Sequence, residues 1–117
     1  MDHKKLDVWN KSIDFVTMIY KRTKSFPKEE MYGLTNQIRR AVVSISSNIS
    51  EGSARNSDKE FVHFLYISLG SLAEVETQII ISEKLEYLSG SSVIHDNILQ
   101  IRQMLLGLIK YLRNKKS

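Results

Sequence analysis

Apolar residues recur three and four residues apart through most of this chain, in four segments separated by clusters of glycine, proline and serine. That spacing places them on one face of an α-helix. Pro27 ends the first segment, Gly52 is suited to the left-handed residue that closes the second, and Gly90 follows the third. Short connections make successive helices antiparallel neighbours. The sequence therefore predicts an all-α fold, an antiparallel up-down-up-down four-helix bundle, formed by residues 1–117 as a single domain.

Each helix is expected to turn one apolar stripe toward the core. Ser57 and Glu60 form a capping box at the start of the third helix, in which each side chain satisfies an otherwise unpaired backbone amide. The expected core residues are Leu6, Trp9, Ile13, Val16 and Tyr20 in the first helix; Leu34, Ile38, Ala41, Ile45 and Ile49 in the second; Phe61, Leu65, Leu72, Val75 and Ile79 in the third; and Ile94, Ile98, Ile101, Leu105, Leu108 and Leu112 in the fourth.

The first and third helices carry more apolar residues than one core-facing stripe requires. Left in water, the additional residues would form exposed apolar patches, which usually mark interfaces. The alternative is that they are isolated surface residues, which are normal on proteins. We interpret them as an oligomer interface made by Val8, Phe15 and Ile19 in the first helix and Ile67, Ile81 and Leu85 in the third.

The net charge of +4 is unevenly distributed, because residues 1–28 and 91–117 each carry +4 and residues 57–90 carry −4. Two basic ends are typical of a protein with an anionic partner such as nucleic acid. The alternative is complementary charge between neighbouring helices or subunits. The candidate phosphate-binding residues are Lys21, Arg22 and Lys24 with Lys28; the pair Arg39 and Arg40; and Lys110 and Arg113 with Lys115 and Lys116, which the bundle topology brings near Lys4 and Lys5. Few aromatic residues lie among these in the sequence, so base stacking is not expected.

The second helix also carries a polar stripe beside its apolar one. Serine and asparagine are mediocre helix formers, so their recurrence within a helix needs a reason. One interpretation is a hydrogen-bonded network between helices, with Arg40 paired to Glu51 or to an acidic residue of the third helix. The other is a polar recognition surface. The stripe consists of Gln37, Arg40, Ser44, Asn48 and Glu51.

No assembled enzyme site is evident in the sequence. There is no cysteine, and the single Glu60–His63 tetrad supplies too few ligands for the di-iron sites that helical bundles can hold. Three scattered histidines and no glycine-rich phosphate loop give no nucleophile with an adjacent base. We expect a non-enzymatic protein without cofactor or metal. A polar start and short apolar runs predict a cytoplasmic protein without a membrane span.

Several short motifs, in order along the first three helices, resemble the bacterial family of 23S rRNA intervening-sequence proteins. These proteins are similar to the accessory variability proteins of diversity-generating retroelements. The resemblance implies a four-helix protomer, a ring-like homopentamer and, for the retroelement branch, binding of nucleic acid and of a reverse transcriptase. The motifs are Leu6-x-Val8-Trp9; Phe26-Pro27-x-x-Glu30-x-Tyr32-Gly33-Leu34; Gln37-Ile38-Arg39-Arg40-Ala41-x-x-Ser44-Ile45-x-x-Asn48-Ile49-x-Glu51-Gly52; Lys59-Glu60-Phe61; and Gly70-Ser71-Leu72-x-Glu74 with Glu76.

The leading hypothesis from the sequence is a non-enzymatic homopentameric bundle that binds RNA or DNA through phosphate contacts, without sequence readout. A ring would repeat each basic patch, so that several weak contacts act together. The alternative is a protein-interaction adaptor or an accessory subunit, for example of a reverse transcriptase, that makes no direct nucleic-acid contact. A third possibility, an RNA-processing enzyme, lacks a catalytic constellation.

Overall fold

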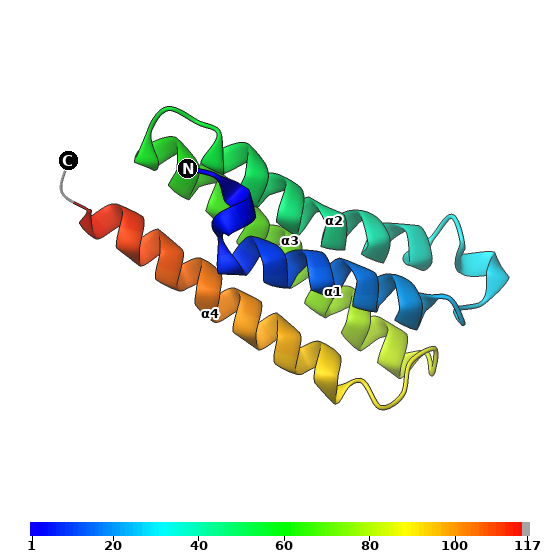
Figure 1. Ribbon diagram of the computed structural model, residues 1–117. Coiled ribbons are helices and arrows are strands. Elements are labelled where there is room, and N and C mark those ends of the chain that lie inside the picture. Colours follow the sequence, from blue (N-terminus) through cyan, green and yellow to red (C-terminus); the bar gives the residue numbers. More distant parts are fainter. Residues whose placement is uncertain (116–117) are drawn as a thin grey trace.

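Four helices make up most of the computed structural model, which describes residues 1–115. They are α1 (Asp7–Thr23), α2 (Leu34–Ser53), α3 (Asp58–Lys84) and α4 (Ser92–Asn114), with short 3-10 helices at His3–Lys5 and Lys28–Glu30. Successive helices run in opposite directions along a bundle 50 Å long, as Figure 1 shows. The described part of the chain contains no strand. The predicted all-α four-helix fold is confirmed.

Local capping and turn interactions set the helix boundaries, and the sequence predicted one of them wrongly. The Ser57 hydroxyl accepts a hydrogen bond from the Glu60 amide at 3.2 Å, as expected at the start of α3. Gly90 takes a positive φ of 59° in the connection to α4. The prediction that Gly52 takes a left-handed conformation at the end of α2 is wrong. Gly52 lies within α2, and a Cβ atom there would stand 2.7 Å from Cβ of Phe64.

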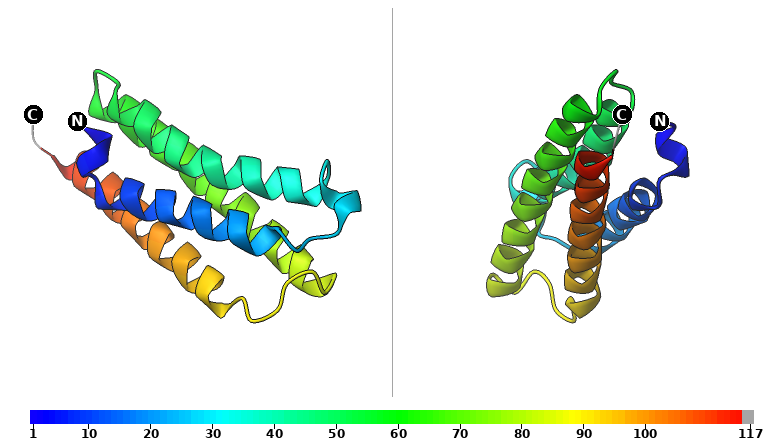
Figure 2. Two further views of the ribbon diagram at one scale, coloured as in Figure 1. Left: turned by 45° about the vertical axis from the view of Figure 1, so that its right-hand side comes forward. Right: turned by 90° about the vertical axis from the view of Figure 1, so that its left-hand side faces the viewer.

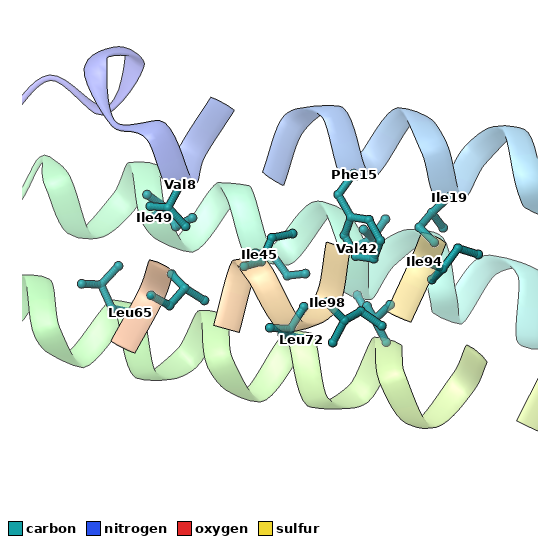
Figure 3. Packing of buried hydrophobic residues seen from close by; sticks show 14 of the residues in the cluster. Val8, Phe15, Ile19, Val42, Ile45, Ile49, Leu65, Leu72, Ile94 and Ile98 are labelled. Carbon is teal, nitrogen blue, oxygen red and sulfur yellow. The ribbon is translucent and has the colours of Figure 1, made fainter. Parts of the chain in front are cut away.

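The core contains the predicted faces of α2, α3 and α4, whereas on α1 the buried apolar residues are Val8, Phe15 and Ile19, and the predicted Leu6, Trp9 and Val16 are half-buried against the core. Phe15 and Ile19, predicted as interface residues together with Val8, are fully buried, and Val8 is 4% exposed. Figure 3 shows Phe15 lying among core residues of the neighbouring helices. Ile13 and Tyr20, predicted as core, are 36% and 39% exposed. The part of the predicted interface that lies on α1 is therefore wrong.

The reason for this error is that α1 carries two apolar stripes and its buried face is interrupted by polar residues. Ser12 and Thr23 are both on the buried face. Their hydroxyls donate to backbone carbonyls one turn earlier, to Trp9 at 2.7 Å and Ile19 at 2.8 Å. Local hydrogen bonds satisfy these groups, so burying them carries little penalty. Because both residues are polar, a hydropathy pattern assigns their face of α1 to solvent. The pattern therefore favours the other stripe, which contains Ile13 and Tyr20.

Candidate nucleic-acid interface

The predicted cationic residues divide between the two ends of the bundle. Lys21 and Lys24 lie in and just after the last turn of α1, beside the first half of α2, which carries Arg39 and Arg40. Lys110 and Arg113 lie near the end of α4, at the opposite end of the molecule. The start of α1 lies at the same end of the bundle as the last turns of α4 (Figure 2). Lys116 lies outside the described residues.

A groove of about 620 Å³ lies where α2 meets the end of α1, and we call it the α1–α2 groove. Arg39 crosses between the helices: its Nε donates to Oγ1 of the buried Thr23 at 3.0 Å, and its guanidinium lies 4.7 Å from the ring centroid of Tyr20. Arg40 is exposed and forms no hydrogen bond or ion pair within residues 1–115. No carboxylate from the described chain lines this groove, so it is electropositive. Its lining residues are Tyr20, Asn36, Arg39, Arg40, Val43, Ser44 and Ser47.

Arg22 has a structural contact that the sequence did not reveal. Its Nη2 atom donates to the carbonyl of Ser89 at 2.6 Å, and Nη1 lies 3.5 Å from the carbonyl of Gly90. These carbonyls belong to the connection between α3 and α4, where no helical partner is available. Arg22 therefore fastens this connection to α1, while Lys21 and Lys24 remain exposed.

The polar stripe on α2 is only partly an internal network. Oγ of Ser44 and Oγ of Ser71 on α3 are 2.8 Å apart, and Nδ2 of Asn48 donates to Oγ of Ser44 at 3.0 Å. Arg40 does not pair with Glu51, so that predicted ion pair is wrong; Glu51 instead accepts from Arg55 at 3.0 Å. Gln37 is exposed, like Arg40 and Glu51. The stripe thus combines a short interhelical network with an exposed polar surface.

A larger groove, of about 850 Å³, lies at the beginning of α3 and the end of α4, and we call it the α3 groove. The guanidinium of Arg113 lies 5.3 Å from the ring centroid of Tyr66, and that of Arg55 lies 4.7 Å from the ring centroid of Phe64. Asp58, at the edge of the groove, faces Nζ of Lys115 at 3.6 Å. The residues that line the α3 groove are Arg55, Asp58, Lys59, Glu60, Val62, His63, Phe64, Tyr66, Leu112 and Arg113.

Several basic residues have aromatic neighbours in the fold that their positions in the sequence did not indicate. Three arginines lie over aromatic rings, and each pair lines one of the two grooves. Two of the pairs join different helices far apart in sequence, so a linear motif search cannot find them. The pair formed by Arg55 and Phe64 spans the α2–α3 turn. These two residues are close in the sequence, so this is the one pair that the sequence could have indicated.

A cluster of Glu83, Ser91 and His95 joins the end of α3 to the start of α4. The Ser91 hydroxyl donates to Oε2 of Glu83, and Nε2 of His95 lies 3.0 Å from the same oxygen. Both side chains face the carboxylate, so the imidazole is not placed to accept the serine proton, as nucleophilic catalysis requires. Within residues 1–115, no group of three or more His, Asp or Glu side chains is arranged to hold a metal ion.

Hydrogen bonding sets the ionisation of Glu83. The Ser91 hydroxyl is the main cause that lowers the pKa of Glu83 below its ordinary value of 4.5, with partial burial opposing the shift and His95 adding to it. A carboxylate whose folded pKa is lowered stabilises the folded state at neutral pH. That contribution declines as the pH falls below about 4.5 toward the folded-state pKa. The cluster therefore stabilises the connection between α3 and α4.

α3 exposes much of its apolar surface. Ile67, Ile81 and Leu85 are 39%, 42% and 50% exposed, so the α3 part of the predicted interface is accessible. By length and composition alone, α3 is apolar enough to cross a membrane, a test that core helices of soluble proteins also pass. Only 33% of its apolar window is buried in the bundle. On α4, Leu99 and Leu106 are 52% and 47% exposed.

Comparisons with known proteins agree with the motifs found in the sequence. A family model described as 23S rRNA-intervening sequence protein matches residues 4–107. A crystal structure of a protein of unknown function from the S23 ribosomal protein family, from Bacteroides thetaiotaomicron, is similar to this chain with a TM-score of 0.81. The two sequences are 25% identical, and the similarity covers 94% of this chain and 99% of that one. No curated protein matches the chain.

Proposed function

This chain belongs to the 23S rRNA-intervening sequence protein family, and from that premise we propose that it is a non-enzymatic homopentamer that binds RNA or DNA through phosphate contacts. The observation that carries this proposal is the α1–α2 groove, where two arginines converge and the described residues contribute no carboxylate. Guanidinium groups match phosphate geometry, and serine and asparagine side chains also donate to phosphate oxygens. Contacts of this kind fix the position of a nucleic acid without reading its sequence.

The exposed apolar residues of α3 and α4 support self-association. The segment that contains α3 carries a charge of −4, and the segment that contains α4 carries +4. The apolar patch of one helix can therefore meet the other helix of a neighbouring copy with favourable charge. Because two different surfaces meet, the contact is heterologous, and such a contact forms a ring when the rotation between successive copies closes. A ring places several copies of the α1–α2 groove on one particle, which strengthens weak phosphate binding.

Arg40→Gln tests the binding proposal, because Arg40 is exposed and its charge is not needed by a partner within the described chain. We expect the affinity for a labelled oligonucleotide to fall roughly tenfold and the salt dependence to become shallower, since each subunit loses a phosphate contact. Fluorescence anisotropy between about 50 and about 200 mM salt measures both quantities.

Lys84→Gln is the matched control, because Lys84 is an exposed cation at the end of α3, outside the residues that line either groove. It should leave the affinity close to that of the parent protein. Equal losses for the two variants would mean that only net charge matters, and binding that does not respond to salt would contradict phosphate recognition altogether.

Ile81→Glu tests the oligomer. Burying a carboxylate in an apolar contact has a large desolvation cost and should dissociate the ring, so light scattering should report five chains for the parent protein and one for the variant. Ile13→Glu is the matched control, since Ile13 on α1 is 36% exposed and Ile81 is 42% exposed. Dissociation by Ile13→Glu alone would place the interface on α1. A parent protein that is monomeric at micromolar concentration would refute the oligomer.

The second candidate function is a protein-interaction adaptor, and the exposed apolar surface of α3 is the observation that favours it. In that case a protein partner, instead of another copy of this chain, covers Ile67, Ile81 and Leu85. The two functions are distinguished by nuclease treatment: an adaptor retains its protein partner after nuclease digestion, and Ile81→Glu releases it.

A further inference from the structure

The three arginine–aromatic pairs give the two grooves a common chemistry beyond charge. Tyr20 and Tyr66 are 39% and 44% exposed, and a guanidinium lies over each ring. Each pair presents flat, accessible surfaces, because both guanidinium planes and aromatic rings can stack on a nucleobase. Each tyrosine ring already contacts an arginine, so less conformational entropy is lost when a base stacks on it.

The outer surface of α2 connects the two grooves. Arg40 and Ser44 line the α1–α2 groove, and Glu51 lies farther along α2, where it pairs with Arg55 of the α3 groove. From Arg39 to Ser53, where α2 ends, the helix rises about 21 Å at 1.5 Å per residue. At the rise of about 3.4 Å per nucleotide of a DNA strand, about six nucleotides cover that length, and a more extended strand needs fewer. This is within the range of about 4–16 nucleotides found for single-strand binding sites.

Two of the three carboxylates near this path are paired with cations, and the third, Glu60, lines the α3 groove without an ion pair in the described residues. Glu51 faces Arg55 at 3.0 Å and Asp58 faces Lys115 at 3.6 Å. Lys59, in contrast, forms no ion pair within the described residues and lies on the edge of the α3 groove. The path therefore leaves Arg40 and Lys59 free for phosphates near its two ends.

We propose that the two grooves together bind single-stranded nucleic acid in preference to duplex, with unpaired bases stacked at Tyr20 and Tyr66 and phosphates at Arg40 and Lys59. This inference rests on the proposed function and specifies its substrate class. In a duplex the base faces are covered by their neighbours, so a duplex can use only the cations. A single strand can use both the cations and the stacking surfaces.

The test measures the binding of a thymidylate oligomer of about 20 nucleotides, longer than one site, and of a duplex of the same length. The protein should bind the single strand at least tenfold more tightly than the duplex. Tyr20→Leu and Tyr66→Leu keep an apolar side chain but remove the stacking surface. Each should weaken single-strand binding about fivefold or more and weaken duplex binding by a clearly smaller factor. Tyr32→Leu, at a tyrosine that is 95% exposed and is not part of either groove, is the control.

The outcomes separate this inference from the function on which it rests. One outcome is that single strand and duplex bind equally, that Arg40→Gln weakens both, and that the tyrosine variants weaken neither. In that case phosphate binding stands and the preference for single strands is wrong. If neither probe binds, both proposals are wrong. Circular dichroism of each variant confirms that a loss of binding is not a loss of fold.

Discussion

Phe15→Ala is expected to destabilise the protein by about 3–5 kcal/mol, the cost typical of removing a buried phenylalanine ring. Phe15 is fully buried and lies among core side chains from the neighbouring helices, so the truncation leaves a cavity that the surrounding bundle cannot fill (Figure 3). Urea unfolding measures the effect as a lower midpoint at unchanged slope, with protein concentration held fixed because the chain is proposed to self-associate.

Ile13→Ala is the control that makes this result decisive about α1. Ile13 is 36% exposed, so its truncation should cost about 1 kcal/mol or less in the free energy of unfolding. The opposite order, with Ile13→Ala the more damaging of the two, would show that α1 packs through the stripe that the sequence favoured. Such a result would mean that Phe15 is exposed. Phe15 would then again be a candidate residue of the oligomer interface.

The sequence predicted the core of three helices because, on each of them, the most regular apolar stripe is the one that the bundle buries. In α2, for example, Ile38, Ile45 and Ile49 are all fully buried, as the spacing indicates. α1 differs, since it offers two stripes and interrupts the buried one with Ser12 and Thr23. Periodicity measures how apolar residues are spaced, and it does not measure which of two faces the rest of the bundle covers.

Some features of the candidate site were likewise predictable from the sequence, and others were not. The electropositive pair Arg39 and Arg40 was visible in the sequence, because adjacent charges need no tertiary structure to be noticed. The stacking of Arg113 on Tyr66 joins α4 to α3, and no local pattern encodes it. The grooves themselves also depend on how helices diverge at their ends. Charge was therefore predictable, and the aromatic partners of that charge were not.

Gly52→Ala is expected to destabilise the protein by about 1–3 kcal/mol, although alanine is normally preferred to glycine in a helix by about 1 kcal/mol. The reason is steric. The added Cβ would lie 2.7 Å from Cβ of Phe64 and 2.9 Å from Cδ1 of Phe61, so α2 and α3 would have to separate where they pack most closely. A Cβ atom cannot move without its backbone, so the Phe64 contact cannot be relieved by a rotamer change.

Gly107→Ala supplies the matched comparison, because Gly107 lies within α4 and a Cβ there would meet nothing within 4 Å. Helix propensity then acts alone, and the variant should be more stable than the parent by about 0.5–1 kcal/mol. The two substitutions are chemically identical and are expected to shift the urea midpoint in opposite directions. A stabilised Gly52→Ala variant would show that α2 and α3 do not approach as closely as this structure places them. The α2–α3 turn and the α3 groove beside it would then have a different shape, since Phe64 belongs both to that contact and to the groove.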